Sequence, residues 1–162
     1  MLTIEPLNEQ NLEDVLMLSV QDEQRPYIGD IDEIIDQSCQ KSEETQWVIC
    51  QAGKPVGFFL LDRAYANRYL FCPQGSVGLR SFLIDQQYQG QGIAKRAIRQ
   101  IQDQYMVWLG KDHSDLYLTV NCKNALARSL YVKAGFMDTE QLYLGGEAGP
   151  QHIMCFKSKK RG

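Results

Sequence analysis

The 162-residue sequence lacks the features that mark membrane-embedded and secreted proteins. No apolar stretch approaches the roughly 18 residues that a membrane-spanning helix needs. The first residues, MLTIEPLNEQNLEDV, contain acidic side chains and have neither the basic start nor the apolar run of a secretory signal peptide. We therefore expect no membrane span and no export by that route.

Disulfide and metal-site patterns are absent as well. The cysteines are odd in number, widely spaced and never arranged as C-x-x-C, which argues against a disulfide framework and against a zinc site. We therefore expect a reduced, cytoplasmic location and no metal. The five cysteines are Cys39, Cys50, Cys72, Cys122 and Cys155.

Positive charge is scarce too. The chain has 17 Lys and Arg against 20 Asp and Glu, a net charge of −3, so it has no overall basic field to attract nucleic acid or an anionic membrane surface. A hydrophobic content of 44% with 23% charged residues is typical of a folded globular protein, and the length fits one domain over 1–162. A neutral or cationic small molecule is the partner that this composition favours.

Hydrophobic periodicity predicts strands around a charged, partly helical insert in the first half of the chain. We interpret this insert as a helical lid and not as core. The expected elements are a strand over 2–7, a helix capped by Asn8 that runs to about Leu18, the lid over 19–44 with a short helix after Asp30, a hairpin over 46–63 turning at Ala52-Gly53-Lys54, and a loop over 64–76.

The second half predicts a strand-helix-strand unit, whose two strands should run parallel. Together the elements predict an α/β (α+β) fold, with one mixed sheet of about seven strands and helices on its faces. The expected elements are a strand over 77–85, a helix from Ile93 to about Trp108, a strand over 115–120, a helix from Asn124 that ends at Gly135, and two closing strands.

A glycine-spaced loop lies between the strand and the helix of this unit, in DQQYQGQGIAKRAI (residues 85–98). Glycines allow positive φ and close backbone approach, and the helix N-terminus adds partial positive charge, so the loop predicts a phosphate site. The P-loop pattern is absent, and the dinucleotide fingerprint fails because Lys95 occupies its third glycine position.

Two motifs carry a resemblance to a known family. The first is Gln87-x-x-Gly90-x-Gly92, and the second, about 30 residues later, is N-x-x-A-x-x-L-Y-x-x-x-G-F over residues 124–136. The chain resembles the GNAT superfamily of N-acetyltransferases, which implies acetyl-CoA as co-substrate and a twisted sheet with a central splayed pair of parallel strands. RPYIGD, SFLIDQQYQGQG and LYLGGE are similar to the diamine (spermidine/spermine-type) branch.

The resemblance implies a role for each motif residue. Tyr131 would donate a proton to the departing CoA thiolate, and a backbone N–H of Leu83 or Ile84 would stabilise the oxyanion. Asn124 would contact the pantetheine, for which its role as helix N-cap is an alternative explanation. The strand residues Phe82, Leu83 and Ile84 would pair with the pantetheine arm, and Gln89, Gly90, Gln91, Gly92, Ile93, Ala94 and Lys95 would hold the pyrophosphate.

The acceptor side departs from the diamine branch. That branch has an acid in the strand before the loop, where this chain has Leu79-Arg80-Ser81-Phe82. Arg80 would repel a polyamine if it faces the site, or it would bind a carboxylate of an amino acid or peptide acceptor. The lid acids could compensate, and the substrate-binding candidates are therefore Glu23, Tyr27 and Arg80, with Asp22 and Asp30 nearby. His113 and His152 are interpreted as structural.

The resulting hypothesis is an acetyl-CoA-dependent N-acetyltransferase that acts by direct attack of a primary amine of a small molecule. The sequence leaves the oligomeric state open, with a homodimer as one option. One alternative is a catalytically silent acyl-CoA-binding module of the same fold, suggested by Arg80. Another is a binding module for a different nucleotide, which rests on the glycine loop alone. A covalent route through Cys122 is disfavoured because no histidine is placed in sequence to activate it.

Overall fold

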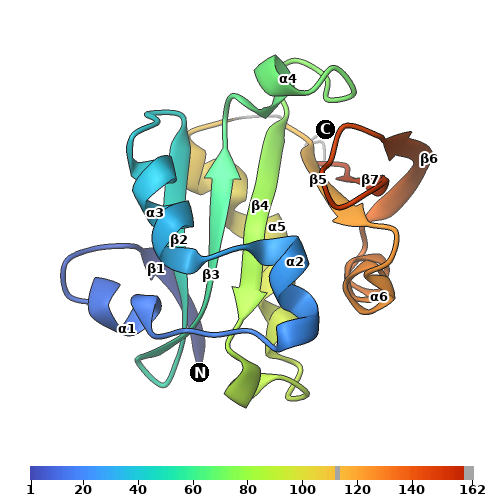
Figure 1. Ribbon diagram of the computed structural model, residues 1–162. Coiled ribbons are helices and arrows are strands. Elements are labelled where there is room, and N and C mark those ends of the chain that lie inside the picture. The colour runs from blue at the N-terminus through green and yellow to red at the C-terminus, as the bar shows by residue number, and fades with distance from the viewer. Residues whose placement is uncertain (112–113, 159–162) are drawn as a thin grey trace.

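The computed structural model describes residues 1–111 and 114–158, so His113 and the end of the basic tail lie outside the described residues. The described residues form a seven-stranded sheet in the order β1-β2-β3-β4-β5-β7-β6, in which only β4 and β5 pair in parallel (Figure 1). The predicted mixed sheet is therefore confirmed. Its strands are β1 (Leu2–Pro6), β2 (Glu44–Gln51), β3 (Lys54–Asp62), β4 (Val77–Ile84), β5 (Leu116–Asn121), β6 (Met137–Tyr143) and β7 (Gln151–Phe156).

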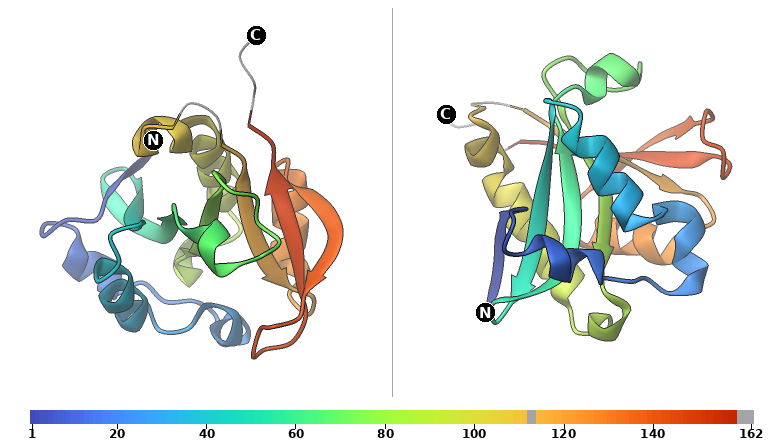
Figure 2. Two further views of the ribbon diagram at one scale, coloured as in Figure 1. Left: turned by 90° about the horizontal axis from the view of Figure 1, so that it is seen from above. Right: turned by 60° about the vertical axis from the view of Figure 1, so that its left-hand side comes forward.

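Helices cover both faces of the sheet, as expected (Figures 1 and 2). On one face Val15 and Ile35 are buried against β2 and β3, and on the other Ile98, Ile101 and Tyr105 are buried in the larger core. The first face carries α1 (Leu12–Leu16), α2 (Arg25–Ile28) and α3 (Ile31–Cys39), the second carries α5 (Ile93–Leu109), and the remaining elements are α4 (Tyr65–Arg68), α6 (Ala125–Lys133) and two 3-10 turns, η1 (Asp22–Gln24) and η2 (Gln86–Tyr88).

Three local predictions are wrong in detail. The first helix begins at Leu12 with Asn11 and not Asn8 as its N-cap, because Asn8 forms a turn in which its Oδ1 accepts from the backbone N–H of Asn11 at 3.0 Å. The short helix α3 is part of the core and not of a lid, since its Ile35 packs against the sheet. The expected loop over 64–76 contains the single helical turn α4.

The β2–β3 hairpin turns where the sequence predicts it. Ala52 and Gly53 have φ values of 51° and 80°, and Gln51 pairs with Lys54. Positive φ at both turn residues is the geometry whose twist matches that of the flanking strands. A register shift between Ile49 and Cys50 then moves the rest of the hairpin by one residue.

The central parallel pair splays apart and opens the space for the site. β4 and β5 pair only through Val77 with Leu116 and Gly78 with Tyr117. Beyond this point β4 is bulged against β3, and Ser81 adopts a φ of 54°, which is unusual for a residue with a side chain. A bulge bends its strand, so we attribute the divergence of β4 from β5 to this position.

Candidate active site

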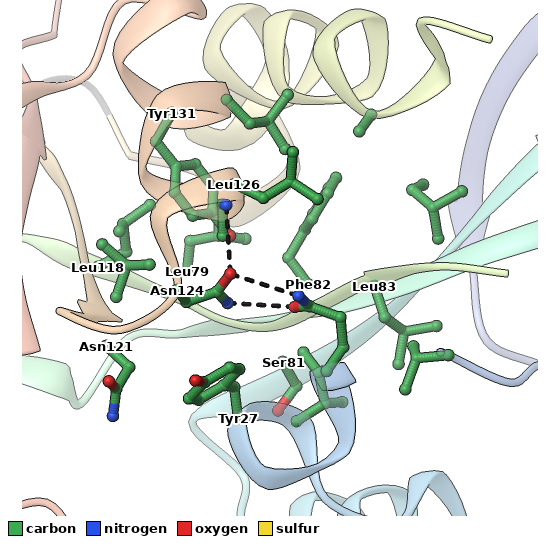
Figure 3. Close-up of a pocket in the computed structure, with 18 of the residues that line it drawn as sticks. Tyr27, Leu79, Ser81, Phe82, Leu83, Leu118, Asn121, Asn124, Leu126 and Tyr131 are labelled. Atoms are coloured by element: carbon green, nitrogen blue, oxygen red, sulfur yellow. Dashed lines mark hydrogen bonds between the residues drawn. The ribbon is translucent and has the colours of Figure 1, made fainter. Parts of the chain in front are cut away.

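A groove of about 710 Å³ occupies the space between the splayed strands. It runs from the glycine loop at the start of α5 to α2, α4 and the loop that joins β6 to β7. Figure 3 shows Tyr27 of α2, Ser81 and Phe82 of β4, Asn124 at the start of α6 and Tyr131 within α6 gathered around this space. Three separate elements therefore contribute these residues to one cavity.

The glycine loop forms one end of the groove. Gly90 and Gly92 have φ values of 80° and 76°, and an added Cβ at either would meet no atom within 4 Å, so the loop leaves open space beside its backbone. Asp85 fixes the base of the loop, because its Oδ1 accepts from Gln87 N at 2.9 Å and its Oδ2 from Ser19 N at 3.1 Å. The 17-residue helix α5 begins directly behind, with Lys95 in its first turn and no acidic residue there. This end can hold an anion such as a phosphate.

Most of the loop residues expected at the phosphate line the groove. They are Gln89, Gly90, Gly92, Ile93, Ala94 and Lys95. Gln91 is exposed and does not line it. The Gln89 side chain donates from Nε2 to the Ile84 carbonyl at 3.1 Å, which ties the loop to the end of β4.

The second half of β4 provides backbone for an extended ligand. Phe82, Leu83 and Ile84 are buried and line the groove. None of the three has a partner in β5 among the described strand pairs, because the parallel ladder stops at Gly78. An extended chain lying between the strands can therefore hydrogen-bond to this edge.

Tyr131 is held at the wall of the groove by packing. Its ring makes edge contacts with Phe82 at 6.4 Å and with Phe136 at 5.7 Å between ring centroids. Its hydroxyl makes no hydrogen bond to any residue that the structure describes, and burial raises its pKa. Tyr131 is therefore protonated at neutral pH and has a proton to give.

Asn124 has two partners. As N-cap of α6 its Oδ1 accepts from Ala127 N at 3.3 Å, which the sequence predicts. Its amide also faces that of Gln24: Asn124 Nδ2 donates to Gln24 Oε1 at 3.1 Å, and Gln24 Nε2 donates back at 3.4 Å (Figure 3). This pair joins the segment before α2 to α6 across the groove, and the sequence contained no signal for a contact 100 residues apart.

A family model decides the relationship of the chain. The model described as Acetyltransferase (GNAT) family matches residues 11–136. The chain belongs to the GNAT acetyltransferase family. The resemblance based on the two motifs is thus confirmed, and with it the enzyme class.

Solved structures agree on the GNAT fold. The spermidine N-acetyltransferase from Vibrio cholerae in complex with CoA and spermine is 21% identical with a TM-score of 0.70, over 97% of this chain and 95% of that chain. The ribosomal-protein-S18-alanine N-acetyltransferase from Escherichia coli is 23% identical with a TM-score of 0.69, over 100% of this chain and 97% of that one. A search of curated proteins gave no match.

The acceptor end of this GNAT groove differs from the expectation at Arg80. The side chain lines the groove, but its Nη1 donates to Glu44 Oε2 at 2.9 Å and lies 3.8 Å from Asp62 Oδ2. Arg68 contacts the same two acids at 2.8 and 3.3 Å. Arg80 is therefore already engaged by an ion-pair network within the protein.

The hairpin register explains this network. With the one-residue shift, Glu44 lies directly opposite Asp62, so two buried carboxylates face each other on adjacent strands. Like charges at opposite positions are destabilising, and a buried carboxylate needs a compensating partner. Burial raises the pKa of Asp62. Arg68 and Arg80 supply the positive charge that these two acids require.

The acidic residues of the segment 19–44, which we expected to bind the acceptor, do not line the groove. Tyr27 and Gln24 line the groove, whereas the exposed Glu23 does not, because the turn η1 directs Gln24 inward at the neighbouring position. Asp22 and Asp30 do not line it either. The acceptor end is instead lined by residues from four segments that no local motif marks, namely α4 with its C-cap, β5, the β6–β7 loop and β7. These residues are Tyr65, Tyr69, Thr119, Asn121, Glu147 and Gln151.

The remaining candidates lie away from the GNAT groove or play structural parts. His152 Nδ1 lies 3.6 Å from Asp138 Oδ2 on the paired strands β6 and β7. Cys122 is exposed and does not line the groove. Across residues 1–111 and 114–158, no group of three metal-ligating side chains is found, and no helix is both long and apolar enough to cross a bilayer.

Proposed function

We propose that this GNAT protein transfers the acetyl group of acetyl-CoA to a primary amine of a small molecule by direct attack. The observation that carries the proposal is the single groove that joins the glycine loop to the Tyr131 phenol along the unpaired edge of β4. Pyrophosphate would bind at residues 89–95, and the pantetheine would follow Phe82, Leu83 and Ile84 toward Tyr131. Asn124 would contact the pantetheine once its amide is released from Gln24.

The chemistry follows from these positions. A neutral amine nitrogen attacks the thioester carbonyl, and the oxyanion accepts a hydrogen bond from the backbone N–H of Leu83 or Ile84. The C–S bond then breaks, the Tyr131 hydroxyl gives its proton to the CoA sulfur, and the nitrogen loses a proton to water. A proton from solvent then restores the Tyr131 hydroxyl. The products are the acetylated amine and CoA.

The acceptor class is a polyamine or an amine of the amino-acid or peptide type. The similar structures are described as acetyltransferases of spermidine and of a ribosomal-protein alanine, one example of each class. A homodimer and a cytoplasmic location remain predictions.

The test is thiol release from acetyl-CoA with a panel of polyamines, amino acids, aminoglycosides and short peptides. Turnover with at least one amine supports the proposal. Tight CoA binding with no turnover across the panel would instead indicate a catalytically silent acyl-CoA-binding module. If ATP displaces CoA at equal concentration, the acetyl-CoA assignment is wrong.

Direct transfer is tested separately at Cys122. Because this thiol lies outside the groove, the variant Cys122→Ala should keep full activity. Complete loss of activity in a folded Cys122→Ala protein would require a covalent acetyl-cysteine route instead.

A further inference from the structure

Away from the glycine loop, the described lining of the groove contains one charged side chain that no other described residue neutralises. Three of the groove's described lining residues are of charged types: Arg80, Lys95 and Glu147. Lys95 lies at the glycine-loop end of the groove, where we propose that the phosphate binds, in the first turn of α5. Arg80 is hydrogen-bonded to Glu44. Glu147 makes no hydrogen bond or ion pair within the part of the chain that the structure describes, so its carboxylate is available to a ligand.

The backbone around Glu147 is anchored to the groove wall. Asn121 Nδ2, at the end of β5, donates to the Ala148 carbonyl at 3.0 Å. Cys122 N donates to the Pro150 carbonyl at 2.9 Å, and Gly149 N closes a turn onto the Gly146 carbonyl at 3.2 Å. These bonds hold the β6–β7 loop against β5. The backbone on either side of Glu147 is therefore fixed to the groove wall.

Two tyrosines that can attract a cation line the same groove as Glu147. Figure 2 (left) shows the β6–β7 loop extending to the side of the sheet that carries α2, and Tyr27 of α2 lines the same groove. Tyr69, the C-cap residue of α4, lines it as well. Tyrosine ring faces attract ammonium groups, and a carboxylate forms charge-assisted hydrogen bonds with them.

We propose that Glu147 binds an ammonium group of the acceptor that does not react, and thereby positions the other amine for acetylation. This inference rests on the proposed function. It narrows the acceptor to a molecule with a second positive charge, because the cation that could have bound an acceptor carboxylate, Arg80, is engaged by Glu44 and Asp62.

Equilibrium binding to the CoA-loaded protein tests the proposal without requiring turnover. The probes are 1,4-diaminobutane, which has the second charge, and butylamine, which lacks it; calorimetry measures their dissociation constants. In the wild type, the diamine should bind about tenfold more tightly than the monoamine. The variant Glu147→Gln should abolish this difference and leave CoA affinity unchanged.

A matched control is Glu13→Gln, which removes an exposed carboxylate from α1 outside the groove and should leave all three affinities unchanged. Added salt should weaken diamine binding in the wild type but much less in Glu147→Gln.

Equal diamine affinity in the wild type and Glu147→Gln would overturn the proposal, and so would a wild type that binds alanine and not the diamine, since Arg80 would then be the anchor. Diamine binding that depends on Glu147 without any thiol release from acetyl-CoA would refute the proposed function alone.

Discussion

The two ends of the groove are built in different ways. The proposed phosphate end is built mainly from one short segment, residues 82–95, and its parts are backbone groups, glycines and the N-terminus of α5. The acceptor end consists of side chains from α2, α4, β4, β5 and the β6–β7 loop. The first can be recognised from local sequence, whereas the second exists only after folding.

The difference also affects how charge is used. At the phosphate end, Lys95 and the start of α5 leave positive potential open toward the groove. At the acceptor end, the arginine that the sequence places in the site is neutralised by two acids from β2 and β3. A charged residue near a site therefore indicates the charge of the substrate only when the protein side chains around that residue are known.

The largest expected effect is at the glycine loop. Gly90→Val should abolish measurable CoA binding, because the new side chain enters the space beside the loop and a branched residue disfavours the φ of 80°. The matched control is Gly53→Val, which has the same φ and the same open surroundings in the β2–β3 turn. Both variants should lose about 1–2 kcal/mol of stability from backbone strain, measured by urea denaturation. Equal loss of CoA affinity in both variants would contradict the assignment of the glycine loop as the pyrophosphate site.

The second effect is on turnover. Tyr131→Phe should lower kcat about 10²-fold with little change in CoA affinity, because only the proton donor is removed. Since burial raises the pKa of Tyr131, deprotonation of this residue should not reduce kcat below about pH 10.

The control for Tyr131 is Tyr105→Phe, which removes a buried hydroxyl that donates to the Ser114 carbonyl far from the groove. It should lower stability by about 1 kcal/mol and leave kcat unchanged. Wild-type kcat in Tyr131→Phe would make Tyr131 a packing residue only.

The third effect tests whether Arg80 belongs to the network or to the substrate. Arg80→Met should lower the free energy of unfolding by about 2 kcal/mol at pH 7, because Glu44 and Asp62 would share Arg68 as their remaining close arginine. Arg25→Met is the comparison, since Arg25 pairs only with the exposed Asp22 at 3.6 Å and its loss should cost little. If Arg80→Met keeps its stability but loses affinity for carboxylate-bearing amines, Arg80 binds the substrate and does not serve the ion-pair network.

The smallest effect concerns the amide pair between Gln24 and Asn124, which spans the groove. Gln24→Ala removes the amide pair with Asn124, so CoA should bind about two- to fivefold more tightly if Asn124 must leave Gln24 to reach the pantetheine. Gln10→Ala, an exposed glutamine before α1, is the control and should leave CoA affinity unchanged. Calorimetry with CoA measures both. Weaker CoA binding in Gln24→Ala would show that the pair supports the loaded groove.

Much of the fold and of the phosphate end followed from the sequence, because their signals are local. Alternation and helical spacing predicted the strands and the helix α5, the turn residues Ala52 and Gly53 predicted the hairpin, and Asn124 predicted the start of α6. Each depends on residues within one or two turns of one another. Helix ends were less accurate, since at Asn8 a turn competes with the helix.

The acceptor end was decided only by the tertiary structure. The register shift in the hairpin places Glu44 opposite Asp62, and without it Leu61 would stand there, so one extra residue determines where Arg80 is held. The same holds for Gln24 against Asn124 and for Glu147 on the anchored β6–β7 loop. Contacts between side chains that are far apart in sequence produce no periodic pattern in that sequence, because they depend on strand register and on bulges. The sequence by itself determined the family, the sheet and the glycine loop at which we propose that the phosphate binds. The tertiary structure decided which charged side chains have no partner within the described part of the protein.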